Sequence, residues 1–231
     1  MKAKNKKMDL NAFRKLPILG IVRGIGKKDL EPLFDAALGG GLRAIEITMN
    51  TPDAPALIRS AVRGYKKDMA IGAGTVVNLK NFNEALRSGA SFIVAPVADE
   101  TIISAAVRRK VPIFPGALTP GEIYRAWNLG ATMVKVFPAG LLGPDYFKEM
   151  KGPFRDIELL ACGGVTAENL PSYFASGASA VSFGASIFRG DFIRQKKFSV
   201  IRREVEKFVK VFYNKSATIT KNEVLHNNRR K

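Results

Sequence analysis

Short apolar runs alternate with amphipathic stretches along most of the chain. Each run consists mainly of Ile, Val, Phe and Ala without polar alternation, as expected of parallel strands that are buried on both faces. The stretches between them carry apolar residues at helical spacing. Successive runs begin 19 to 26 residues apart, about the length of one strand–helix unit. The pattern predicts strands at 18–24, 44–49, 70–76, 92–96, 111–117, 133–138, 157–164 and 180–186.

Eight strand–helix units predict an α/β protein with a single (β/α)8 barrel, and a length of 231 residues suits that fold. An open doubly wound sheet is the alternative, but no G-x-G-x-x-G sequence opens a helix after the first strand. The helices are expected at 30–38, 54–62, 79–88, 99–109, 120–129, 145–150 and 167–176.

The two ends of the chain extend this pattern. Residues 9–16 predict a short extra helix before the first strand, and residues 198–213 predict an amphipathic helix after the last. Residues 214–231 are expected to form a basic, flexible tail. The sequence therefore predicts one domain over residues 1–213, followed by that tail.

Composition favours a folded protein in a reducing compartment. A hydrophobic content of 46% with 25% charged residues excludes a mainly disordered chain. No apolar run reaches the roughly 18 residues that a membrane-spanning helix needs, and the N-terminus has no apolar stretch typical of a secretory signal. Cys162 is the only cysteine, so no intrachain disulfide can form. We expect a cytoplasmic protein with no membrane partner.

The net charge of +17 is concentrated at the two ends of the chain. Residues 1–15 carry six Lys/Arg and one acidic residue, and residues 189–231 carry thirteen and four. Residues 16–188 are close to neutral, with eighteen basic and fifteen acidic residues. The termini could bind a polyanion, but solvated basic ends are the simpler interpretation, and a nucleic-acid partner is not expected.

The single histidine, His226, lies in the polar C-terminal stretch. The predicted barrel therefore has no histidine for a Ser-His triad or for an imidazole metal site. Acid–base chemistry must use Glu, Asp, Lys, Tyr or water. No metal and no cofactor are expected.

Two predicted strands each carry a lone charge. Glu46 stands in A-I-E-I-T, on the same face as Thr48, and Lys135 stands in M-V-K-V-F. Burying a charge costs several kcal/mol unless it is paired or neutralised. One interpretation is an ion pair that only fills the barrel. The favoured one is catalytic: burial makes the Lys135 amine available as a neutral nucleophile, and Glu46 carries protons, which is the equipment of Schiff-base chemistry on a carbonyl substrate.

Further candidates lie where predicted strands end, at the face of a barrel that carries active sites. Arg23 follows the first strand and Thr75 the third. Gly163 and Gly164 follow the seventh strand and Gly184 the eighth, where backbone N–H groups of such turns bind phosphate in this fold. Plain tight turns are the alternative for these glycines.

These residues resemble, in order, the family of 2-keto-3-deoxy-6-phosphogluconate (KDPG) and 4-hydroxy-2-oxoglutarate (KHG) aldolases. The likeness covers roughly residues 17–190. It rests on I-V-R-G (21–24), G-L-R-A-I-E-I-T (41–48), I-G-A-G-T-V (71–76), F-I-V-A-P (92–96), I-F-P-G-A-L-T-P-G-E (113–122), V-K-V-F-P-A (134–139) and G-G-V (163–165).

The resemblance implies a class I aldolase without a metal, acting on a small keto acid and an aldehyde. Lys135 would form the imine and Glu46 would move protons. It also implies a homotrimer. The substrate-binding residues would be Arg23, Thr48, Thr75, Pro96, Phe137, Gly163, Gly164, Gly184, Ala185 and Ser186.

Three positions depart from the family pattern. Asn50 stands where some relatives have an Arg, Cys162 where they often have Thr, and Ala185 where they commonly have Ser. Cys162 is interpreted as a small filler beside the site rather than as a reactive thiol. A hydroxyl donor to phosphate would be lost at Ala185 or shifted to Ser186, and a lost charge-assisted donor would cost about 1.5–3 kcal/mol, so these departures bear on the identity of the substrate's distal group.

Several functions therefore stay open. The leading expectation is cleavage of KDPG to pyruvate and glyceraldehyde 3-phosphate. KHG or 2-keto-3-deoxy-6-phosphogalactonate could be the substrate instead. A phosphate-binding isomerase or synthase would explain the glycines but not Lys135, and a non-enzymatic barrel scaffold would use only the basic ends.

Overall fold

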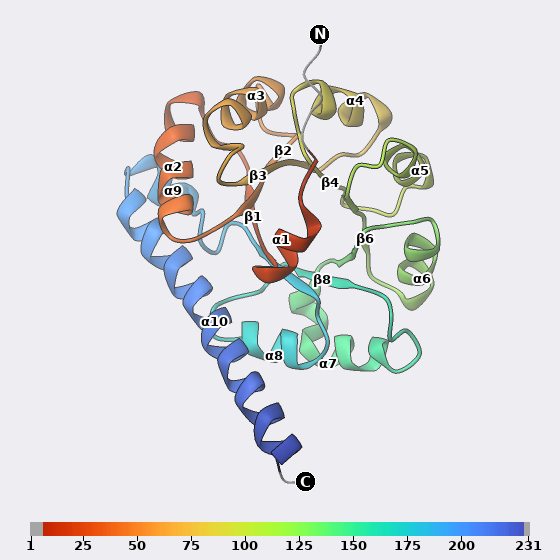
Figure 1. Ribbon diagram of the computed structural model, residues 1–231. Coiled ribbons are helices and arrows are strands. Elements are labelled where there is room, and N and C mark those ends of the chain that lie inside the picture. The colour runs from red at the N-terminus through yellow and green to blue at the C-terminus, as the bar shows by residue number, and fades with distance from the viewer. Residues whose placement is uncertain (1–6, 229–231) are drawn as a thin grey trace.

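The computed structural model describes the chain from residue 7 to residue 228, and its side chains as far as residue 214 (Figure 1). The strands are all parallel and form one sheet in the order β5-β4-β3-β2-β1-β9-β8-β7-β6, which is nearly closed into a barrel. The strands are β1 (Ile18–Val22), β2 (Ala44–Thr48), β3 (Ala70–Gly74), β4 (Ile93–Val94), β5 (Ile113–Phe114), β6 (Gly116–Ala117), β7 (Val134–Val136), β8 (Leu159–Cys162) and β9 (Ala180–Phe183). The predicted (β/α)8 barrel is confirmed.

The predicted fifth strand is divided into β5 and β6 by Pro115. Proline has no N–H to donate to a neighbouring strand, so the ladder is interrupted at that residue. The Pro115 carbonyl still accepts a hydrogen bond of 2.8 Å from the backbone N–H of Lys135 on β7. β5 pairs with β4 and β6 pairs with β7, so this one bent segment joins the two ends of the sheet.

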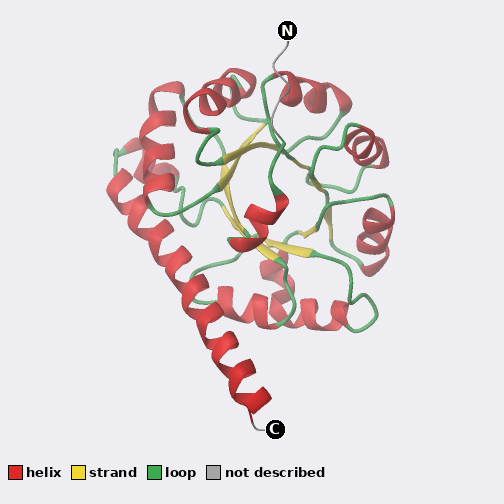
Figure 2. Cartoon of the chain, in the orientation of Figure 1, coloured by secondary structure: helices red, strands yellow, loops and turns green. Residues whose placement is uncertain are grey.

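Helices surround the barrel, as Figure 2 shows. Where the sequence predicts a helix, the structure has one. The five-residue α9 was not predicted. The helices are α1 (Leu10–Lys15), α2 (Lys27–Gly39), α3 (Ala54–Tyr65), α4 (Leu79–Arg87), α5 (Glu100–Arg108), α6 (Pro120–Asn128), α7 (Ala139–Lys151), α8 (Leu170–Ala175), α9 (Gly190–Arg194) and α10 (Phe198–Asn228).

Apolar side chains form two separate clusters, one between the strands and the outer helices and one inside the barrel. The inner cluster combines Leu19, Phe92 and Phe114 from the strands with Met8 and Phe13 from the N-terminal segment. Helix α1 therefore covers the N-terminal end of the barrel, and it lies across the ring of strands in Figure 1. The opposite end, where the strands finish, remains for the functional site.

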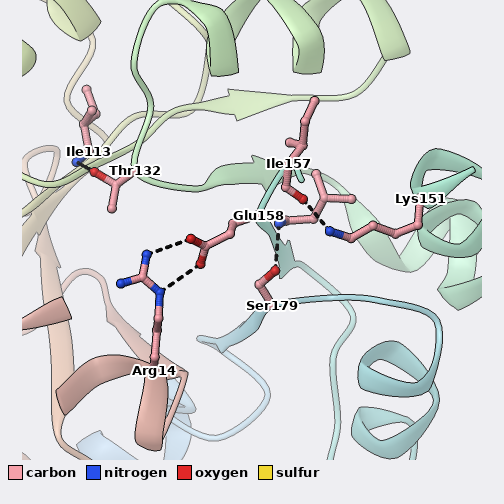
Figure 3. A network of polar contacts seen from close by, with 8 residues as sticks. Arg14, Ile113, Thr132, Lys151, Ile157, Glu158 and Ser179 are labelled. Carbon is pink, nitrogen blue, oxygen red and sulfur yellow. Dashed lines mark hydrogen bonds and ion pairs between the residues drawn. The ribbon is translucent and has the colours of Figure 1, made fainter. Parts of the chain in front are cut away.

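An ion pair fastens α1 to this closed end. Arg14 Nε and Nη2 donate to the two carboxylate oxygens of Glu158, at 3.1 Å and 2.7 Å (Figure 3). Glu158 directly precedes β8, whose first N–H, on Leu159, donates to the hydroxyl of Ser179. Two parallel N–H···O bonds fix a direction as well as a distance, so this contact sets the position of α1.

Helix α10 begins where the sequence predicts, but its backbone continues past residue 213 as far as Asn228. Ile201, Val205 and Phe208 are buried against the rest of the fold. The division into a domain over 1–213 and a flexible tail over 214–231 stays a prediction. No helix of the described chain is long and apolar enough to cross a membrane.

Candidate active site

Glu46 and Lys135 both lie inside the barrel. Their strand neighbours, such as Ile45 and Val136, belong to the outer apolar cluster, so alternation directs the two charged side chains inward. Glu46 is 2% exposed and Lys135 is 8% exposed. The structure thus brings the predicted carboxylate and amine into one buried space.

Burial controls the chemistry of the Glu46 carboxyl. Removal from water raises the pKa of Glu46 to about 7, although the nearby positive charges of Lys135 and Arg23 oppose the rise. Glu46 Oε2 is buried and has no hydrogen-bond partner in the described part of the chain. A carboxyl with such a pKa can give and take a proton near neutral pH.

The alternative of a simple ion pair is not what the structure shows. The ion pairs among the described side chains include neither Glu46 nor Lys135. Lys135 instead contacts the face of Phe137, with Nζ 4.7 Å from the ring centroid. Phe137 is 44% exposed, so the lysine contacts a ring that is itself open to solvent.

Arg23 and Thr75 meet at the mouth of the barrel, the end where the strands finish. The sequence predicts both residues at this end but not their contact with each other. Arg23 Nη2 donates to Thr75 Oγ1 at 3.4 Å, and the Arg23 side chain is exposed. Thr75 has φ of 53°, a left-handed conformation that β-branched residues rarely adopt. Such a conformation is kept only where surrounding contacts enforce it, which is frequent at functional sites.

Thr48 is linked by hydrogen bonds to the turn that carries Arg23. Its hydroxyl is fully buried and lies 3.0 Å from the hydroxyl of Thr51, which accepts a hydrogen bond of 3.0 Å from the Gly24 N–H. This chain of contacts ties β2 to the turn that follows Arg23. Thr51 could not be predicted from the sequence, because its importance depends on a neighbour brought close only by folding. Direct contact of Thr48 with substrate stays a prediction.

We expect Thr51→Val to raise KM several-fold and to destabilise the fold by about 1–3 kcal/mol, because the Gly24 N–H then loses its buried acceptor. Steady-state kinetics and thermal unfolding measure the two effects. Thr51→Ser keeps the hydroxyl and is the matched control. Equal KM values for the two variants would contradict a role for this hydroxyl in holding the Arg23 turn.

The predicted glycine-containing turns after β8 and β9 lie at the mouth of the barrel. Gly163 and Gly164 have φ of 88° and 79°, which favours glycine at both positions. The backbone N–H groups of Gly164, Ala185 and Ser186 donate to no acceptor within the described chain. Exposed N–H groups from two adjacent turns can bind an anion.

Pro96 lies half-buried at the end of the fourth strand segment, with its carbonyl close to Gly116. A Cβ on Gly116 would lie 2.1 Å from that carbonyl oxygen. The site residues expected from the sequence are thus all at the inner or C-terminal part of the barrel, while their individual roles stay predictions.

The chain was compared with known protein families to identify the class of protein to which this site belongs. The family described as "Aldolase: KDPG and KHG aldolase" matches residues 10–204, which includes the whole barrel. The chain belongs to the KDPG and KHG aldolase family. This aldolase is therefore a carbon–carbon lyase, which separates it from the isomerase, synthase and scaffold alternatives.

Individual relatives agree with that assignment. A 2-dehydro-3-deoxy-phosphogluconate aldolase of Pseudomonas aeruginosa is 35% identical over 202 residues, which cover 84% of this chain and 89% of that protein. A 2-dehydro-3-deoxy-6-phosphogalactonate aldolase of Escherichia coli strain K12 is 34% identical, over 76% of this chain and 86% of that protein.

Among solved structures, a KDPG aldolase of Legionella pneumophila, described as holding pyruvate as a covalent carbinolamine intermediate, superposes with a TM-score of 0.77 at 25% identity. The match covers 82% of this chain and 92% of that one. Relatives named for different sugar acids are thus similar to this aldolase to almost the same degree.

Cys162 of the aldolase lies inside the barrel and is 3% exposed. Burial raises the pKa of its thiol, although the charge of Lys135 and a hydrogen bond with Ser182 oppose the rise. A thiol with a raised pKa is a poor nucleophile, which supports the interpretation of Cys162 as a filler.

Proposed function

We propose that this aldolase reversibly cleaves KDPG to pyruvate and glyceraldehyde 3-phosphate through a Schiff base on Lys135. The observation that carries the proposal is the buried Glu46 carboxyl, with one unpartnered oxygen, inside the same barrel as the Lys135 amine. An amine nucleophile and a carboxyl with a pKa of about 7 are the two groups that aldol cleavage of a keto acid requires.

The reaction begins at the keto carbon. The Lys135 amine attacks C2 of the substrate and gives a carbinolamine, which loses water to form the protonated imine. The C3–C4 bond then breaks, and its electron pair passes to C3 as the imine becomes an enamine. Glu46 takes the proton of the C4 hydroxyl, so that C4 leaves as the aldehyde. Protonated Glu46 returns a proton to C3, and water hydrolyses the imine to release pyruvate and the free amine.

Two regions of the mouth support recognition of the charged ends of the substrate. Arg23 and Thr75, which are hydrogen-bonded to each other, offer a cation and a hydroxyl to the carboxylate. The free N–H groups of Gly164, Ala185 and Ser186 offer donors to the distal phosphate. KDPG, which carries a carboxylate at one end and a phosphate at the other, makes use of both regions.

Ala185 favours KHG as the second candidate substrate. Ala185 has no hydroxyl, so the donor that relatives commonly have at this position is lost or shifted to Ser186, and KHG has no phosphate to bind there. Comparison of kcat/KM for KDPG, its galactonate epimer and KHG distinguishes the three substrates. A preference for KHG would leave the proposed chemistry at Lys135 intact. It would contradict the proposal that the glycine-containing turns bind a phosphate.

The proposal is tested by trapping. Incubation with pyruvate and borohydride reduces the imine to a stable secondary amine, and peptide mass mapping then locates the adduct. We expect the added mass on the peptide that contains Lys135, and an adduct on the same peptide when KDPG replaces pyruvate, because both keto acids form an imine with the same amine. An adduct on another lysine, or none, would overturn the proposal.

We also expect kcat/KM for cleavage to rise with pH through a midpoint near 7. The Glu46 carboxyl must be ionised to accept the C4 hydroxyl proton, and its pKa is raised to about 7 by burial. A pH–rate profile measures this limb. A midpoint near 4.5, the ordinary value for a glutamate, would contradict Glu46 as the base.

We further propose that the protein is a cytoplasmic homotrimer, which rests on the family resemblance and on the single cysteine. Light scattering should give a mass near three times the 25.2 kDa of one chain. A monomeric mass at assay concentration would contradict it.

A further inference from the structure

Strand β3 carries two glycines whose missing side chains face the barrel interior. A Cβ placed on Gly72 would lie 2.3 Å from the ring of Phe92, and a Cβ placed on Gly74 would lie 2.1 Å from Glu46 Oε1 and 2.5 Å from its Cδ. Real Cβ atoms essentially never approach another atom below 3.0 Å. The space above Gly74 is therefore occupied by the Glu46 carboxylate itself.

We propose that Gly74 is a positioning residue for the aldol reaction: its bare Cα provides the space in which the Glu46 carboxylate rests. The inference depends on the proposed function, because it concerns the placement of the proposed acid–base group. Gly74 itself touches no reacting atom.

Space, rather than backbone freedom, requires glycine at this position. The residues of the described chain with φ in the left-handed region do not include Gly74. Its backbone is held against β2, since it is in register with Thr48 and its carbonyl accepts a hydrogen bond of 2.7 Å from the Met49 N–H. On the other side of β3, the N–H of the preceding residue, Ala73, donates to the Phe92 carbonyl at 3.1 Å. The strand therefore cannot withdraw easily from a new methyl group, and the carboxylate must move instead.

Moving the carboxylate has a chemical consequence. Oε1 lies against β3 over Gly74, while Oε2 has no partner and is free to exchange a proton. Rotation of the carboxylate away from β3 changes the direction of both oxygens and their separation from Lys135, whose charge lowers the pKa of Glu46. A misplacement of about 1 Å at a catalytic group can reduce the rate about 10²-fold.

The experiment compares Gly74→Ala with Gly72→Ala. Both variants add one methyl group to the inner face of the same strand, but only the first meets Glu46. We expect Gly74→Ala to lower kcat about 10²-fold and to shift the midpoint of the pH–rate profile. Gly72→Ala should lower the melting temperature while leaving that midpoint unchanged. Gly74→Ala with the wild-type kcat and midpoint, or the same shift in Gly72→Ala, would overturn the proposal.

A stability cycle decides the matter even if Gly74→Ala folds poorly. Gly74→Ala is combined with Glu46→Ala, which removes the carboxylate that the new methyl group would meet. We expect Gly74→Ala to destabilise the wild type and to have little effect in the Glu46→Ala background. An undiminished loss of stability in that background would overturn the proposal. Borohydride trapping on Lys135 tests the proposed function separately, so failure of one is distinguishable from failure of the other.

Discussion

Lys135→Met should lower kcat/KM for aldol cleavage by about 10⁴- to 10⁶-fold, because the variant has no amine with which to form the imine. Every later step depends on that covalent bond, so residual binding of the substrate cannot replace it. Methionine fills nearly the same space, and the fold should survive because Lys135 makes no ion pair with the described side chains. Pyruvate-dependent borohydride trapping should disappear together with activity.

Lys151→Met is the matched control for this experiment. Lys151 lies at the end of α7, and its Nζ donates to the backbone carbonyls of Arg155 and Ile157, at 3.1 Å and 2.6 Å. We expect this variant to lose stability but to keep trapping and turnover. Loss of trapping in both variants would indicate a general effect of removing a lysine side chain and would contradict a unique role for Lys135.

Glu46→Gln should lower kcat by about 10²- to 10⁴-fold, the usual contribution of a general acid–base group. The amide has nearly the shape of the carboxyl but cannot accept the C4 hydroxyl proton. The rise of kcat/KM through a midpoint near 7 should vanish along with the group that causes it. A pH–rate profile of the variant that keeps this limb would assign the limb to another residue.

The same substitution should change the dependence of stability on pH. The pKa of Glu46 is about 7 in the folded protein and 4.5 as an ordinary glutamate, so between these values the folded state holds a proton that the unfolded chain has released. Raising the pH through this window therefore reduces the stability of the wild type, by about 3 kcal/mol in total. The free energy of unfolding of Glu46→Gln, measured relative to that of the wild type, should therefore increase by the same amount from acid to alkaline pH.

Urea unfolding at several pH values measures this gain. Glu158→Gln is the control, because Glu158 is ion-paired with Arg14 at the closed end of the barrel. That variant should be destabilised and should retain kcat. A stability difference between Glu46→Gln and wild type that does not change with pH would contradict a raised pKa for Glu46.

Much of the fold follows from the sequence because buried parallel strands and amphipathic helices have different, readable periodicities. Glu46 and Lys135 could be predicted as site residues because each is the lone charge in an apolar strand. The split at Pro115, the short α9 and the helical backbone beyond residue 213 were not predicted, since each depends on tertiary pairing or lies in a polar stretch with weak periodicity. The contributions of Thr51 and Gly74 could not be predicted, because their partners come from other segments of the chain.

Helix α1 closes the N-terminal end of the barrel, and this closure affects the order in which the two products leave. With Met8 and Phe13 packed into the N-terminal end of the barrel, molecules reach Lys135 from one side only. Under the proposed reaction, substrate enters and products leave through the same end of the barrel, and the aldehyde fragment lies nearer that end than the pyruvate still bound to Lys135. We therefore expect the aldehyde to depart first and pyruvate last, so that pyruvate alone, and not the aldehyde, loads the resting enzyme for synthesis.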